Sequence, residues 1–210
     1  MKPLQDYVAA KLLQVKAIKL QPHHPFLWGN GWESPIYFDS RKLLSYPNIR
    51  TAIKVQMARA VIEQYPEVEV IAAVATNAIA VGMMVAEVLG LPFVYIHPSP
   101  KDHGFENMIE GDLKPRQNVV VVEDQVSIGN HSMKVVDAIR QNGCKVLGMV
   151  TIFNYELPQT ATYFSEAGVE LTALTNFFAV LNRAIEIKYI SGDDLKIFYN
   201  WQKNPEIWRK

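Results

Sequence analysis

The sequence predicts an α/β fold built on a mostly parallel, doubly wound sheet. Segments of strand and helix periodicity alternate along residues 68–187, which is typical of consecutive βαβ units. The run Val119–Val122 is apolar at every position, as expected of a strand covered on both faces. A length of 210 residues suits a single domain with a substantial core.

The first 65 residues precede this alternation. An apolar stripe predicts a helix over 6–19, and Pro47 opens an amphipathic helix that reaches about Tyr65. Between them, residues 26–42 combine two glycines with five aromatic side chains in an alternation typical of a hairpin. This aromatic density suits either a flap of the core or a platform on which a base stacks.

The later elements follow in order. We expect strands over 68–75, 93–96, 119–122, 145–153 and 169–174, and helices over 78–89, 132–141, 160–167 and 176–187. The segment between Ile96 and Gln117 has no clear period, and a loop of that length is usually functional. The predicted organisation is an N-terminal hood at about 1–45, a core at about 46–190, and a C-terminal helix at about 191–210 anchored by tryptophans.

Composition narrows the class of protein. The 21 basic and 21 acidic residues balance, so there is no electrostatic case for nucleic acid as a partner. No apolar run approaches 18 residues and the N-terminus lacks a signal-peptide pattern, so we expect a cytoplasmic protein without a membrane partner. The single cysteine, Cys144, lies in a strand pattern and is expected to be a buried structural thiol.

The strongest functional pattern spans residues 118–132. Glu123 and Asp124 follow the apolar run where the strand is expected to end, a loop with Ser127 and Gly129 comes next, and a helix starts near Ser132. Ligands of open α/β sheets bind at this end of the strands, and a loop that enters a helix presents N–H groups to anions. Adjacent carboxylates can accept hydrogen bonds from a sugar diol or hold Mg²⁺, so the acids and the anion loop together favour a phosphorylated sugar. The alternative is an acidic strand end that caps an ordinary turn.

The same stretch resembles the phosphoribosyl-diphosphate (PRPP) signature of type I phosphoribosyltransferases. Three further segments make the resemblance to the orotate phosphoribosyltransferase family specific. GWESPIYFDSRK within residues 26–42 is similar to the family's hood, AAVATNAI at 72–79 to its pyrophosphate loop, and KDHGFENMIEG within 95–111 to its mobile catalytic loop.

The resemblance implies transfer of the phosphoribosyl group of PRPP to orotate, with Mg²⁺ held mainly through PRPP and not directly by the protein. It also implies a homodimer. The residues it assigns to catalysis are Lys101, His103 and Asp124. Those it assigns to substrate binding are Ser34, Tyr37, Thr76, Asn77, His97, Lys101, His103, Glu123, Asp124, Ser127, Ile128, Gly129, Asn130 and His131.

Several of these positions depart from the family pattern. In the phosphate loop, Ile128, Asn130 and His131 replace a hydroxyl, a glycine and a second hydroxyl, and His97 stands in place of an arginine. A residue other than glycine at positive φ is strained, and asparagine tolerates that conformation best. The alternative to an active enzyme is therefore a relative that is non-catalytic or altered in substrate, and that binds nucleotide or PRPP in a regulatory role.

Overall fold

Apolar runs and amphipathic helices alternate to build a six-stranded sheet in the computed structural model of the chain, which describes residues 2–99 and 108–209. The strand order is β10-β9-β8-β5-β6-β7, and every neighbouring pair is parallel except β6 with β7. This confirms the predicted doubly wound sheet. The strands are β5 (Val70–Val74), β6 (Phe93–Ile96), β7 (Ile109–Glu110), β8 (Asn118–Val126), β9 (Lys145–Asn154) and β10 (Leu171–Asn176).

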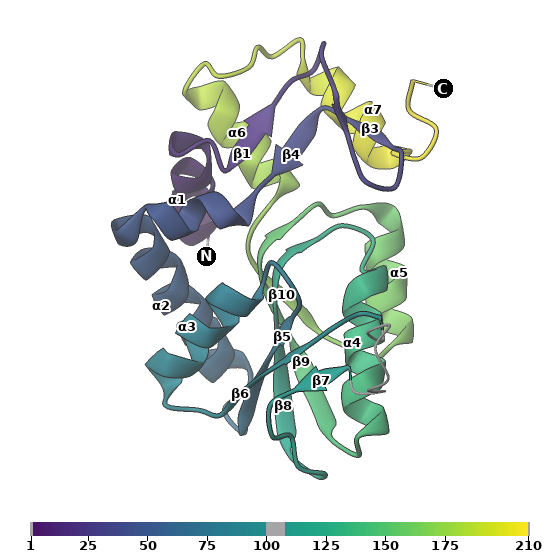
Figure 1. The fold of residues 1–210 in the computed structure, drawn as a ribbon. Helices are drawn as coiled ribbons and strands as arrows, with labels where there is room; N and C mark the ends of the chain where they lie inside the picture. The colour runs from purple at the N-terminus through teal and green to yellow at the C-terminus, as the bar shows by residue number, and fades with distance from the viewer. Residues whose placement is uncertain (1, 100–107, 210) are drawn as a thin grey trace.

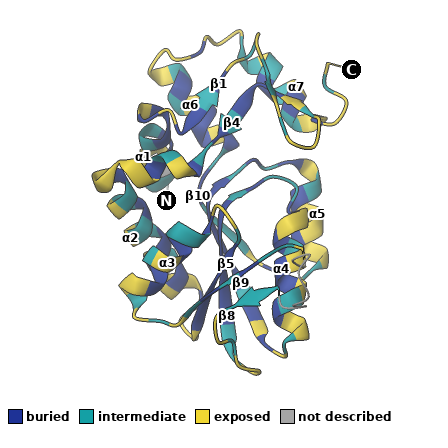
Figure 2. Ribbon diagram, viewed as in Figure 1, coloured by how far each residue is buried: buried dark blue, intermediate teal, exposed yellow. Residues whose placement is uncertain are grey.

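Helices cover the sheet on both faces (Figure 1). On one side lie α2 (Pro47–Gln64) and α3 (Ile79–Leu89), and on the other lie α4 (Asn130–Gln141) and α5 (Pro158–Glu166). The sheet between them forms the centre of the core, since Val119–Val122 are 0% exposed (Figure 2). Cys144 is also buried, as predicted.

A second layer of structure lies above the carboxyl ends of the strands (Figure 1). It contains two small antiparallel pairs, β1 with β4 and β2 with β3, and α1 packs on α6 beside them. From here on, the hood denotes residues 15–45, the part of the predicted N-terminal hood that follows α1. The elements of the layer are α1 (Lys2–Gln14), β1 (Ile18–Leu20), β2 (Phe26–Leu27), β3 (Glu33–Ser34), β4 (Ile36–Phe38), the 3-10 helix η1 (Ser40–Ser45), α6 (Phe177–Glu186) and α7 (Leu195–Lys203).

In the N-terminal region, one predicted helix boundary was wrong and the predicted hairpin is confirmed only in part. The helix predicted over 6–19 ends at Gln14, because Lys16 takes a left-handed conformation (φ 53°) and the chain turns so that Ile18 pairs with Phe38. Within the predicted hairpin of residues 26–42, β2 and β3 pair with each other. The remaining strand, β4, pairs with β1, which lies outside the predicted hairpin. Strand pairing partners depend on tertiary contacts that local periodicity does not contain.

The strand predicted over 119–122 also proved longer. It continues through Glu123 and Asp124 to Val126, which pairs with Asn154 at the end of β9. The two acids therefore belong to the strand itself, and their backbone is fixed by the sheet. The following helix begins earlier than predicted, at Asn130.

Candidate active site

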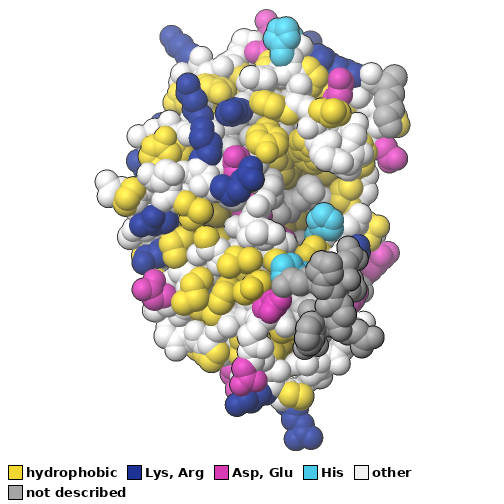
Figure 3. Space-filling view, viewed as in Figure 1, with side chains coloured by type: hydrophobic (Ala, Val, Ile, Leu, Met, Phe, Trp, Pro, Cys, Tyr) yellow, Lys and Arg dark blue, Asp and Glu magenta, His cyan; other side chains and the backbone are white. Residues whose placement is uncertain are grey.

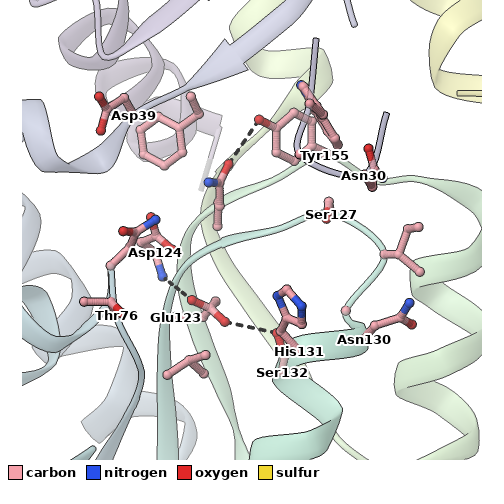
Figure 4. A pocket seen from close by; sticks show the side chains of 18 of the residues that line it. Asn30, Asp39, Thr76, Glu123, Asp124, Ser127, Asn130, His131, Ser132 and Tyr155 are labelled. Atoms are coloured by element: carbon pink, nitrogen blue, oxygen red, sulfur yellow. Dashed lines mark hydrogen bonds between the residues drawn. The ribbon is translucent and has the colours of Figure 1, made fainter. Parts of the chain in front are cut away.

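A cavity of about 580 Å³ lies between the hood and the carboxyl ends of β5 and β8. Figure 3 shows this hollow near the middle of one face, with basic side chains gathered to its left. Its lining comes from the hood, the β5–α3 loop, β8 with the loop that follows it, and Tyr155 after β9. Segments far apart in the sequence thus meet around one space (Figure 4).

The floor of the cavity carries the two carboxyl groups of β8. Glu123 is 6% exposed and Asp124 is 3% exposed. Burial raises the pKa of Glu123 well above its ordinary value, and the neighbouring charge of Asp124 adds to this rise. Burial also raises the pKa of Asp124, while a hydrogen bond from the Ser40 hydroxyl opposes the rise.

Two buried hydroxyls hold this carboxyl pair in place. Ser132 Oγ, in the first turn of α4, donates to Glu123 Oε2 at 3.1 Å (Figure 4). Ser40 Oγ, in η1 of the hood, donates to Asp124 Oδ2 at 2.5 Å. The second contact joins residues 84 positions apart and ties the hood to the sheet directly at the cavity.

The loop between β8 and α4 is shaped for an anion. Gly129 has φ 101°, and a Cβ there would lie 2.8 Å from the ring of Phe164, so only glycine fits. No side chain caps the N-terminus of α4, which leaves its first N–H groups available to a ligand at the cavity. Asn130 is already helical and does not take a positive φ, so the structure does not require a glycine at this departure from the family pattern.

The second loop of the cavity joins β5 to α3. Thr76 and Asn77 are exposed here, directly before α3, whose N-terminus no side chain caps. The peptide bond between Ala75 and Thr76 is cis. This loop and the loop after β8 lie at the ends of neighbouring parallel strands, so one ligand can contact both.

Aromatic side chains of the hood and of β9 form the upper wall. Trp28 packs edge-on against Tyr155 with ring centroids 5.0 Å apart, and Tyr155 packs against Phe153 at 4.7 Å. From α7, Trp201 is 0% exposed and donates from Nε1 to the carbonyl of Glu33 at 3.0 Å. Trp201 therefore holds α7 against the hood, where its ring also packs edge-on against Trp28.

The structure brings most of the predicted site residues to this cavity. Those that line it are Tyr37, Thr76, Asn77, Glu123, Asp124, Ser127, Ile128, Gly129, Asn130 and His131. Ser34 and His97 are not among the lining residues. Ser34 is 0% exposed and its hydroxyl donates to the Ile36 carbonyl at 2.8 Å, while His97 Nε2 lies 4.0 Å from Glu110 Oε1. Lys101 and His103 lie outside the described residues.

Sequence reasoning missed several residues of the site. Arg41 lines the cavity and its guanidinium binds both carboxylate oxygens of Asp39, at 2.7 and 3.1 Å, which lowers the pKa of Asp39. Gln125 and Tyr155 also line the cavity. Gln125 could have been found from the sequence, because it is a polar residue close to the apolar run of a predicted strand. No pattern in the neighbouring sequence identifies Ser40 as the partner of Asp124.

A sugar phosphate suits this arrangement. A buried carboxyl pair faces the same space as two uncapped helix N-termini, at the carboxyl edge of a parallel sheet and under a hood. Together with the fold, these features define the chain as a type I phosphoribosyltransferase.

Comparison with known proteins identifies the family within this class. The chain is 50% identical over 208 residues to the orotate phosphoribosyltransferase of Porphyromonas gingivalis, covering 99% of each chain. It is 51% identical to that of Phocaeicola vulgatus, covering 99% of this chain and 98% of the relative. The chain therefore belongs to the orotate phosphoribosyltransferase family. No family profile matches it.

Solved structures agree on the fold. The crystal structure of orotate phosphoribosyltransferase from Aeropyrum pernix superposes with a TM-score of 0.74 at 22% identity, covering 88% of this chain and 99% of that one. At this level of identity, the likeness supports the fold alone.

Proposed function

We propose that the protein transfers the phosphoribosyl group of PRPP to orotate, giving orotidine 5′-phosphate and diphosphate in pyrimidine nucleotide synthesis. The observation that carries this proposal is the carboxyl pair of β8 facing the uncapped N-terminus of α4 within one cavity. Relatives half identical over nearly the whole chain bear the name of this activity. No observation favours a non-catalytic relative.

The cavity offers a place for each part of PRPP. Glu123 and Asp124 are acceptors for the ribose hydroxyls, and the N–H groups at residues 127–131 receive the 5-phosphate. The Thr76–Asn77 loop, at the end of the adjacent strand, receives the diphosphate. Orotate then lies on the hood side near Trp28 and Tyr37, where it faces the anomeric carbon.

The reaction forms a bond from a ring nitrogen of orotate to the anomeric carbon while the bond to diphosphate breaks. Positive charge on the ribose in the transition state is stabilised by ionised carboxylates, and the departing diphosphate needs cationic partners. Among the described lining residues, Arg41 and His131 are the basic side chains. Lys101 and His103, which lie outside the described residues, remain the predicted catalytic side chains, and His97 remains a predicted substrate-binding residue.

Magnesium belongs to the proposal as a partner of PRPP. In the described part of the chain, no three His, Cys, Asp or Glu side chains cluster as a metal site. An ion that arrives on the diphosphate would enter a cavity whose described lining carries the carboxyl groups of Asp39, Glu123 and Asp124. When bound, Mg²⁺ would neutralise part of the charge of the leaving diphosphate.

We also propose that the protein is a cytoplasmic homodimer. Exposed apolar side chains lie on α2 (Val55 and Ile62) and on α3 (Met83 and Val88), which pack against each other. Hydrophobic side chains gather below the hollow in Figure 3, on the side where α3 lies in Figure 1. No described helix is long and apolar enough to cross a membrane.

A turnover assay tests the function. The protein is incubated with Mg²⁺, PRPP and, in separate reactions, orotate, uracil, hypoxanthine or adenine. We expect nucleotide and diphosphate only with orotate, and loss of both in Asp124→Asn. Product with another base alone would reassign the substrate. No product with any base, despite measurable PRPP binding, would overturn the proposal in favour of a binding protein.

A further inference from the structure

Gln125 is a polar residue that directly follows the four valines and two acids of β8. It lies between Asp124 and Val126 on β8, it is half-buried, and it lines the cavity. The sheet fixes its backbone, because Gln125 pairs with Phe153 of β9. Its amide is therefore presented to the cavity from a rigid element.

Tyr155 holds one end of this amide. Its hydroxyl donates to Gln125 Oε1 at 3.1 Å (Figure 4). The tyrosine is itself only 2% exposed and is packed edge-on by Trp28, Phe153 and Trp201. Burial raises the pKa of Tyr155, so the hydroxyl keeps its proton and remains a donor at physiological pH.

The other end of the amide is free to bind a ligand. With Oε1 engaged by a donor, the –NH₂ group of Gln125 is the part left over. Within the described residues, no hydrogen bond is made by Gln125 Nε2. Gln125, held by Tyr155, thus presents an N–H donor at the cavity wall. A ligand with an acceptor at this position would satisfy the donor.

The position of the pair indicates which part of the substrate it meets. The carboxyl pair that suits the ribose is on the same strand directly before Gln125, and Tyr155 contacts Trp28 of the hood. The pair therefore stands between the ribose site and the hood, where the proposed function places the base.

We propose that Gln125, oriented by Tyr155, is a specificity-determining residue that donates a hydrogen bond from Nε2 to a ring carbonyl of the base. The inference rests on the proposed function. Orotate carries carbonyl acceptors on its ring, whereas an amino group at the same position would place a donor against the donor of Gln125. The pair therefore favours oxo-substituted over amino-substituted six-membered bases.

The test uses the whole protein and separates base binding from PRPP binding. Gln125→Leu removes the donor, and we expect the KM for orotate to rise about three- to tenfold, as for loss of one neutral hydrogen bond. The dissociation constant for PRPP should stay unchanged. Tyr155→Phe frees the amide, so we expect a smaller rise in the KM for orotate with the same kcat. Gln141→Leu, at the exposed end of α4 and outside the cavity, is the matched control.

A pair of ligands that differ by a ring carbonyl against an amino group tests specificity. Gln125→Glu replaces the donor by a charged acceptor of the same shape. The added charge opposes both anionic ligands, so the test is the ratio of the KM for orotate to the inhibition constant of cytosine-6-carboxylate, and the preference for orotate should shrink. An unchanged KM for orotate in both Gln125 variants would overturn the inference, as would an equal loss of PRPP binding. Failure of the proposed function would appear differently, as absence of turnover by the unaltered protein.

Discussion

Glu123 and Asp124 are two neighbouring carboxyl groups that the fold removes almost wholly from water. Because the pKa of Glu123 in the folded protein lies above its ordinary value of 4.5, the folded state holds this proton more tightly than the unfolded chain does. The resulting stabilisation is complete below the unfolded value and is lost as the pH rises through the raised pKa. The ionised pair that suits a ribose therefore costs stability at neutral pH.

The loss of stability on ionising buried Glu123 leads to the first prediction. Glu123→Gln keeps the acceptor for the Asp124 N–H, at 3.1 Å in the native site, but has no proton to lose. We expect its melting temperature to exceed that of the unaltered protein at pH 8 and to match it near pH 4. PRPP should bind about ten- to a hundredfold more weakly, since a hydrogen bond to a charged group contributes roughly 1.5–3 kcal/mol.

The control for this prediction is Glu166→Gln at the exposed end of α5, which removes a charge far from the carboxyl pair. Melting temperatures from pH 4 to pH 8 are compared by calorimetry, and PRPP affinity is measured by titration. Parallel pH dependence in Glu123→Gln and the unaltered protein would contradict the account of the buried proton.

At the scale of elements, the junction between β8 and α4 sets where a phosphate can lie. Gly129 turns the chain at φ 101° while packed against the Phe164 ring of α5. The strand supplies the carboxyl pair and the helix supplies free N–H groups, so this one turn fixes their relative position. Its geometry depends on an element 35 residues further along the chain.

We expect Gly129→Ala to destabilise the protein by about 2–4 kcal/mol, combining left-handed strain of roughly 1 kcal/mol with overpacking of about 1–3 kcal/mol. PRPP binding should weaken as the start of α4 shifts. Gly168→Ala is the matched control, because its φ is also positive (60°) but no atom lies within 4 Å of the added Cβ. Chemical denaturation measures both variants.

The double variant Gly129→Ala/Phe164→Ala provides the decisive comparison at this junction. If the clash with the ring contributes, the two changes are less destabilising together than the sum of their separate effects. Strict additivity would show that Phe164 does not constrain the turn.

At the scale of the whole molecule, the proposed dimer needs a surface that the monomer leaves uncovered. Val55 and Met83 are 44% and 49% exposed on α2 and α3, on the side of the sheet away from α4 and α5. We expect the unaltered protein to sediment at twice its 23.8 kDa chain mass at micromolar concentration. Val55→Asp/Met83→Asp should sediment at the chain mass, because two buried charges oppose association.

Tyr163→Asp is the control for this surface. It introduces the same charge at a 43% exposed aromatic side chain of α5, on the opposite side of the sheet. A single 23.8 kDa species for the unaltered protein would refute the dimer.

The sequence by itself determined the class of fold and the core of the site. Strand and helix periodicity is local, so the βαβ order and the limits of β6 follow from residue pattern alone, and the motif at 123–131 placed a carboxyl pair beside an anion loop. These features could be predicted from the sequence because each is encoded within a few consecutive residues.

Only the tertiary structure decided how distant segments complete the cavity. That β4 pairs with β1, that Ser40 binds Asp124, and that Tyr155 orients Gln125 are contacts across 16 to 84 positions. No local pattern encodes them, because each depends on how the sheet, the hood and α7 pack. The same reason explains why Asn130, expected to replace a glycine under strain, is an ordinary helical residue: α4 begins there, and Gly129 alone makes the turn.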